Sequence, residues 1–383
     1  MTLSSLIFTG VLFLAPFLLS VTKKARPWLF LSLNLGLLAW SMGSWERALV
    51  TAIWLLVPYW ASSIVKKPGW LIGVMVVGFV YLNRYDWIFG SLSVPYLFAF
   101  KLLGLSYILF RQIDFILNRS TLSKSDVSLI NYLNYCVSFY TFIAGPIQRF
   151  EAFVQNMKEP IDVASIDVLK QLHRVFDGYI KVFVLSALFS SWATLAYRDL
   201  ALSFSFLTLI WLMITNALFI YFNFSGYCDV VIGMGVLAGF KIPENFNKPY
   251  LAQDLSDFWS RWHITLTTWL TDYVFNPLVQ TLARKDWFSF ENIRLLAFFG
   301  TFLLAGLWHG STLNFLIYGL LQAIGVSLST LYVDVMSKKL GSRKAYKAYR
   351  SKGWLKITEI FVTLSYVSMS FLFVGFDILA LWR

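Results

Sequence analysis

Residues 69–82 read "GWLIGVMVVGFVYL", a run with no charged side chain. Residues 3–20 form a second apolar run without charged residues, "LSSLIFTGVLFLAPFLLS". Each run approaches the roughly 20 apolar residues that a helix needs to cross the hydrocarbon core of a bilayer. Over the whole chain of 383 residues, 58% are hydrophobic and 14% are charged, whereas soluble domains carry about 25% charged residues. With a mean hydropathy of +0.65, the sequence predicts an all-α, polytopic membrane protein.

Apolar runs recur along the chain and predict about ten or eleven membrane segments, with re-entrant or amphipathic stretches among them. The plainest runs are residues 3–20, 28–43, 48–65, 69–83, 203–224, 294–308, 312–335 and 357–375. Residues 88–117, 128–147 and 165–190 are interrupted by polar or helix-breaking residues. We expect residues 3–20 to remain as a helix, because their charges follow the apolar run instead of preceding it as in a secretory signal. With no internal repeat, residues 1–383 are expected to form one domain.

The net charge of +12 arises from 32 basic and 20 acidic residues. The basic residues gather in short stretches, "TKKARP" at 22–27, "VKKPG" at 65–69 and "SKKLGSRKAYKAYRSKGWLK" at 337–356. Lys and Arg near helix ends favour the cytoplasmic side of a membrane. The charge therefore indicates topology and contact with membrane lipid, and we expect no nucleic-acid partner.

The amino-acid composition is different between residues 223 and 277. This stretch has too many Gly, Asn, Asp and Pro residues to face lipid, and it is too aromatic for a flexible loop. Irregular backbone at membrane depth is tolerated where it is buried in protein or lines a watery cavity. We therefore expect the functional centre here.

Inside this stretch, residues 258–269 read "FWSRWHITLTTW" and predict an amphipathic helix. Asp254 or Ser256 can cap its start, and Asp257 can reinforce that cap. Pro277 is expected to end it. The helix has a polar side, so it is not a simple membrane span.

His263 lies in this predicted helix, four residues after Trp259 and on the same face. The chain has three histidines. A lone buried histidine is most often a core residue that donates to a carbonyl. The setting among Arg, Trp and Thr favours a functional imidazole, and both interpretations remain open.

His309 lies in "LLAGLWHGSTLNF", residues 303–315, again directly after a Trp. Fifteen residues separate it from Arg294, a helical rise of roughly 22 Å. The loops flanking the two neighbouring helices lie on one membrane face, so His309 is expected at depth, at a Gly310–Ser311 helix break. Ionisable residues at that depth mark functional sites. His173, in contrast, lies at the wet start of an amphipathic helix and is expected to be structural.

The sequence lacks several motifs of known chemistry. It has no GxSxG nucleophile elbow, no GxxxxGK phosphate loop and no HExxH zinc site. The two cysteines have no metal-like spacing, and we expect no metal site. A buried imidazole can by itself act as a general base, here toward an acceptor hydroxyl that attacks an activated ester.

Five motifs resemble those of the membrane-bound O-acyltransferases, and the branch that O-acetylates alginate and other bacterial polysaccharides is the most similar. They read "GLSYILFRQIDFIL" (104–117), "FYTFIAGPIQRF" (139–150), "FNFSGYCDVVIGMGVLAGFKIPENFNKPY" (222–250), "DFWSRWHITLTTWLTDYVFNPL" (257–278) and "LAGLWHGSTLNFLIYGL" (304–320). The resemblance covers residues 103–321, more than half of the chain.

The resemblance implies a set of helices around a central tunnel in the bacterial inner membrane. It places the invariant histidine of the family at His309 and a second one at His263. It implies transfer of an acyl group, acetyl in this branch, from a cytoplasmic thioester to a hydroxyl of an extracytoplasmic polysaccharide. The expected substrate-binding residues are Trp262, Trp308, Arg261, Asp272 and Asn245.

The resemblance also implies that no cofactor stays bound and that the donor is acetyl-CoA or an acyl-carrier thioester. Expected partners are the polysaccharide and either an extracytoplasmic acetyltransferase or an acyl carrier protein. The chain departs from the alginate type after Pro277, where "LVQTLARKD" replaces the usual "PLGGNR". Its short length resembles the branch that transfers D-alanine to teichoic acids, so D-alanyl transfer is one alternative. A non-enzymatic glycan transporter is another.

Overall fold

The computed structural model describes the chain except for residues 1–4, 22–24, 84, 86–103, 286 and 383. The described residues form helices joined by turns, and their single isolated bridge pairs Phe246 with Trp262. The predicted all-α class is therefore confirmed. The interrupted segment at 88–117 lies largely outside the described residues, which there contain α6 (Leu105–Asn118).

Within the described part of the chain, six helical stretches are long and apolar enough to cross a membrane. They are α3 (Trp45–Ile64), the run Val168–Leu202 made of α9, η2 and α10, then α11 (Phe206–Leu237), α15 (Phe290–His309), α16 (Leu313–Lys339) and α18 (Gly353–Gly375). Shorter helices α1 (Leu6–Val21), α2 (Arg26–Met42) and α4 (Pro68–Leu82) occupy the other early segments. Many large apolar side chains point outward, such as Trp70 at 75% exposure, as expected for surfaces that meet lipid. The protein is a multi-pass membrane protein, with six such spans described against the ten or eleven predicted for the whole chain.

Contacts between residues divide the chain into two compact units. The first unit contains residues 1–178 and 227–243, and the second contains residues 179–226 and 244–383. The bounds of the two units fall within helices α9 (Val168–Ile180) and α11. The expectation of one domain over the whole chain stays a prediction.

A buried arginine organises the first unit. Arg111 in α6 is 1% exposed and donates to the carbonyls of Tyr135 and Cys136, at 3.0 and 3.1 Å, and to Thr141 Oγ1. These carbonyls belong to the last turn of α7 (Leu129–Cys136), where backbone acceptors lack helical partners. The arginine therefore stabilises an early helix end, and residues 128–147 form an eight-residue helix followed by turns instead of the predicted long segment.

The end of helix α11 differs from the prediction. The change of composition after Asn223 predicted a helix end near residue 224, yet α11 continues to Leu237. The polar residues in this extension have helical neighbours to bind, since Asp229 accepts from Arg174 of α9 at 3.0 Å. Gly233 allows close packing, because a Cβ there would lie 2.7 Å from the Val175 side chain. Tertiary contacts therefore stabilise a helix that the composition argues against.

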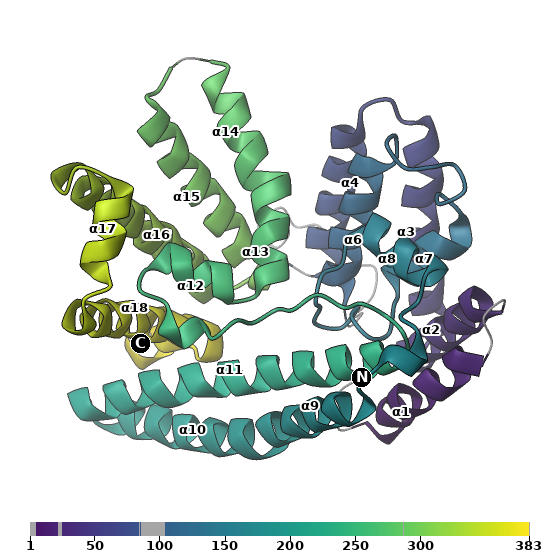
Figure 1. The fold of residues 1–383 in the computed structure, drawn as a ribbon, viewed down its shortest axis with the longest axis horizontal. Helices are drawn as coiled ribbons and strands as arrows, with labels where there is room; N and C mark the ends of the chain where they lie inside the picture. The colour runs from purple at the N-terminus through teal and green to yellow at the C-terminus, as the bar shows by residue number, and fades with distance from the viewer. Residues whose placement is uncertain (1–4, 22–24, 84, 86–103, 286, 383) are drawn as a thin grey trace. The chain divides into compact units, whose positions relative to one another are not determined.

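The second unit is built around α15 and α16, which run side by side (Figure 1). The basic stretch 337–356 contains a short helix, α17 (Arg343–Arg350), where a loop was expected. Arg350 donates to Asp254 at 2.8 Å and to Glu359 of α18 at 2.9 Å. These bonds tie α17 and α18 to the start of the segment that carries His263.

Candidate functional site

The segment around His263 is a series of short helices. They are α12 (Leu255–Arg261), α13 (Ile264–Leu270), the π-helical turn η4 (Thr271–Phe275) and α14 (Asn276–Ala283). Asp254 caps α12, accepting from the Asp257 backbone at 2.8 Å, and the Asp257 carboxylate accepts from the Gln253 backbone at 3.1 Å. The predicted cap at Asp254 is confirmed. The prediction that Pro277 ends the helix is wrong, because the chain stays helical from η4 into α14, and Pro277 lies just after the wider π-helical turn.

The helix breaks at His263, whose φ of 44° and ψ of 50° lie in the left-handed region. A non-glycine residue in that region costs about 1–3 kcal/mol and persists where its surroundings fix it. Here the segment 245–247 runs antiparallel to 261–264, with the Asn247 N–H bonded to the Arg261 carbonyl and the Ile264 N–H bonded to the Asn245 carbonyl. The prediction that Trp259 and His263 share a helix face is therefore wrong.

The His263 side chain is buried, at 4% exposure. Its ring meets the Phe224 ring edge to face at 4.7 Å between centroids. Burial, with a smaller contribution from His309, lowers the pKa of His263 to about 3. The imidazole is therefore neutral across the physiological pH range.

His309 is the last residue of α15, next to the expected break at Gly310. It is half-buried, and its ring lies 6.3 Å from the Phe315 ring and 5.6 Å from the Tyr318 ring. The Trp308 ring lies 4.6 Å from the His309 ring and 6.5 Å from the His263 ring. Two imidazoles that are 46 positions apart in the sequence thus lie near one indole.

A close helix crossing sets the position of His309. At Gly306 in α15 a Cβ would lie 2.4 Å from the Phe315 carbonyl oxygen, and at Gly319 in α16 it would lie 2.5 Å from the Phe302 carbonyl oxygen. The backbones of α15 and α16 approach each other there because neither residue has a side chain. The crossing brings the start of α16, with Phe315 and Tyr318, against the end of α15.

A cavity of about 430 Å³ lies beside the Gly310 break. Its walls include Thr312, Asn314, Asp377 and the same Phe315 whose ring faces His309. Asn314 donates to Asp377 at 2.8 Å in this wall. The end of α15 therefore adjoins a largely apolar space whose wall also contains the Asn314–Asp377 hydrogen bond.

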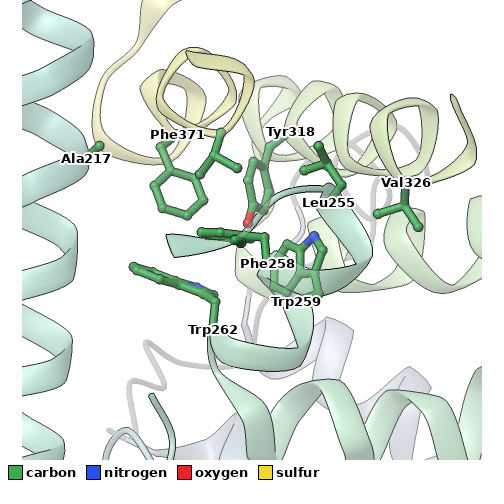
Figure 2. Packing of buried hydrophobic residues seen from close by; sticks show 10 residues of the cluster. Ala217, Leu255, Phe258, Trp259, Trp262, Tyr318, Val326 and Phe371 are labelled. Carbon is green, nitrogen blue, oxygen red and sulfur yellow. The ribbon is translucent and has the colours of Figure 1, made fainter. Parts of the chain in front are cut away.

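Three of the expected substrate-binding residues, Trp262, Arg261 and Asp272, each have a different environment. Trp262 is 4% exposed and packs among aromatic rings, including Phe258 at 5.5 Å and Phe371 at 5.0 Å, as Figure 2 shows. Arg261 pairs with Asp257 at 2.7 Å. Asp272 is exposed on η4. Of the expected residues, Trp308 has its ring 6.5 Å from the His263 ring and 4.6 Å from the His309 ring, and substrate binding by these residues stays a prediction.

Asn245, also expected to bind substrate, is fully buried beside His263, 3.2 Å from its Nδ1 atom. The sequence did not single out the rings of Phe224, Phe315 and Tyr318 that surround the two histidines. Their signal was weak, because each is one aromatic residue in a motif that contains several. Among the described residues, no group of three or more His, Cys, Asp or Glu could hold a metal ion.

Several helices long enough to cross a membrane, together with two neighbouring histidines at helix breaks, define a polytopic membrane protein with a candidate histidine site. Residues 57–349 match the model of the membrane-bound O-acyltransferase family. The match covers well over half of the chain, so the protein belongs to this family and is an acyltransferase. The resemblance seen in the five motifs is confirmed.

Several relatives are named for the polymer that they modify. The chain is 30% identical over 273 residues to the teichoic acid D-alanyltransferase of Bacillus subtilis, a match that covers 70% of this chain and 67% of that protein. It is 31% identical over 272 residues to the "Probable alginate O-acetylase" of Pseudomonas aeruginosa, which covers 69% of this chain and 48% of the relative. It is 34% identical over 216 residues to the peptidoglycan O-acetyltransferase of Helicobacter pylori, with coverages of 55% and 40%.

Proposed function

We propose that the protein transfers an acyl group, with acetyl as the first candidate, from a cytoplasmic thioester to a hydroxyl of an extracytoplasmic polysaccharide. The observation that carries the proposal is that His263 and His309 both lie near Trp308 in a chain of this family. The names of the relatives support a surface polymer as the acceptor. The transporter alternative is set aside because the family consists of acyltransferases.

In the proposed reaction His309 is the general base. The acceptor hydroxyl gives its proton to the imidazole while its oxygen bonds to the carbonyl carbon of the thioester. The carbon–sulfur bond then breaks, and the departing thiolate takes the proton back from His309, which returns to its neutral state. General-base catalysis of this kind contributes about 10²–10⁴-fold in rate.

The cavity beside Gly310 supports entry of the acceptor from that side, since Asn314 and Asp377 offer hydrogen-bonding groups next to the Phe315 ring. The donor, as acetyl-CoA or an acyl-carrier thioester, would enter from the opposite, cytoplasmic side. We expect that no cofactor stays bound. An extracytoplasmic acetyltransferase or an acyl carrier protein would be the matching partner.

D-alanyl transfer to teichoic acid is the second candidate, and a specific observation favours it. The matches cover 67% and 68% of two teichoic acid D-alanyltransferases, but 48% of the alginate relative. Both candidates use the same attack of a hydroxyl on a thioester. They differ in the acyl group and in the carrier that delivers it.

The deciding experiment measures what the protein adds to the cell surface. Purified surface glycan from cells with and without the protein is treated with mild base, and the released acetate and D-alanine are measured. We expect one of them to disappear with the protein and to return with the wild-type gene, but not with His309→Ala. His173→Ala removes an exposed imidazole and serves as the matched control. Unchanged amounts of both groups would contradict the proposal.

A further inference from the structure

One buried amide oxygen, Asn245 Oδ1, has three polar neighbours, which come from His263 and Thr265. Asn245 Oδ1 accepts from the Thr265 backbone N–H at 3.1 Å and from Thr265 Oγ1 at 2.9 Å, and it lies 3.2 Å from His263 Nδ1. Asn245 is fully buried, at 0% exposure. A buried side chain with this many local bonds has one orientation.

The identity of the amide atom is fixed by chemistry. A backbone N–H can only donate, so the side-chain atom that meets Thr265 N must be the oxygen and not the amide nitrogen. A carbonyl oxygen can only accept. His263 Nδ1 must therefore carry the hydrogen of this contact. A neutral imidazole has one N–H, so its lone pair is on Nε2.

The backbone of Asn245 acts on the same residue. Its carbonyl accepts from the Ile264 N–H at 3.0 Å, immediately after the left-handed His263. The side chain binds Thr265, one residue further along. Asn245 thus binds His263 and both residues that follow it, which fixes the strained turn and the imidazole ring together.

We infer that Asn245 is a positioning residue that fixes the Nδ1–H tautomer of His263, with the lone pair of the neutral ring on Nε2. This inference rests on the proposed function, in which His263 takes part in acyl transfer. It refines that function, because a neutral ring with its lone pair on Nε2 cannot polarise the thioester carbonyl through that atom. In this tautomer Nε2 can act toward a substrate only as a hydrogen-bond acceptor.

The first test is spectroscopic and needs no activity. The chain has three histidines, so protein labelled with ¹⁵N-histidine gives few signals, which the variants His173→Ala and His309→Ala help to assign. We expect the His263 signals of a neutral Nδ1–H tautomer in the wild type, and a loss of that preference in Asn245→Ala. An Nε2–H tautomer in the wild type would overturn the inference, even if acyl transfer were never detected.

The second test asks whether Asn245 acts through His263. Activity is measured for Asn245→Ala, His263→Ala and the double variant, each with a thermal melt. We expect the double variant to lose no more activity than His263→Ala alone, because the two changes remove one function. Losses that multiply would overturn the inference by giving Asn245 an independent role. Asn247→Ala, an exposed amide in the same segment, is the matched control and should leave activity unchanged.

Should Asn245→Ala fail to fold, Asn245→Asp replaces it. A carboxylate oxygen keeps the acceptor for Nδ1–H and for Thr265. We expect this variant to keep the Nδ1–H signal of His263. Loss of that signal in a folded Asn245→Asp protein would contradict the assignment.

Discussion

Gly319 provides a test of how the α15–α16 crossing positions His309. In Gly319→Ala the new methyl group would lie 2.5 Å from the Phe302 carbonyl oxygen, half an ångström inside the 3.0 Å that real Cβ atoms keep. It would also make a tight contact of 3.2 Å with Gly306 Cα. The near neighbours are backbone atoms of α15, so no side chain can rotate away. The two helices must separate or slide.

The expected size of the effect follows from this geometry. Overpacking a well-packed contact costs about 1–3 kcal/mol, partly offset by the roughly 1 kcal/mol by which Ala favours a helix over Gly. Function should suffer more than stability, because His309 lies three residues beyond Gly306 in the displaced helix. A misplacement of about 1 Å can lower a rate about 10²-fold.

The assay is acyl transfer by purified protein, together with a thermal melt in detergent. Gly36→Ala is the control, since it adds the same methyl group inside helix α2 and nothing lies within 4 Å of the new Cβ. We expect Gly36→Ala to retain wild-type activity, and Gly319→Ala to lose about 10²-fold while remaining folded. If both variants behaved alike, the crossing would have no role in positioning His309.

Three further results are expected. His309→Ala should lose about 10²–10⁴-fold in acyl transfer with unchanged expression and melting temperature, since a general base is removed but little packing; activity near wild type would exclude it as the base. His263→Ala should lose about 10²-fold or more if the ring binds substrate, whereas a lower melting temperature with turnover retained would identify a core residue. Cysteines at Lys344 and Ser351, both exposed near α17, should react with a membrane-impermeant reagent only after permeabilisation, and the buried Cys136 and Cys228 should give little background. Rapid labelling in intact cells would place this stretch outside and invert the topology.

The sequence predicted those parts of the fold that depend on local chemistry. Apolar runs located α15, α16 and α18, and the Asp254 cap follows from an acidic residue placed before a helical run. The break at Gly310 was predicted from the same kind of local signal. Each of these features can be predicted from only a few neighbouring residues in the sequence.

The wrong predictions concern helix ends that are determined by contacts with residues far away in the sequence. Helix α11 extends past residue 224 where Asp229 meets Arg174, 55 positions earlier. The α7 helix ends where Arg111 takes its last carbonyls, 24 and 25 positions away. No window of local sequence contains these pairs, so hydropathy placed both boundaries wrongly.

The two Trp–His pairs show that a local sequence motif can locate a candidate site without showing what each residue of the motif does there. Trp262 precedes a histidine in the left-handed conformation, and its ring packs in the aromatic cluster around Phe258 and Phe371 (Figure 2). Trp308 precedes a histidine at the end of a regular helix, and its ring lies near both imidazoles. The same dipeptide thus gives one tryptophan of the core and one beside both histidines. The difference is the turn at His263, which is fixed by Asn245, 18 positions away. We therefore expect a change at Asn245 to alter the site more than a change at Trp262, although Trp262 adjoins the histidine in sequence.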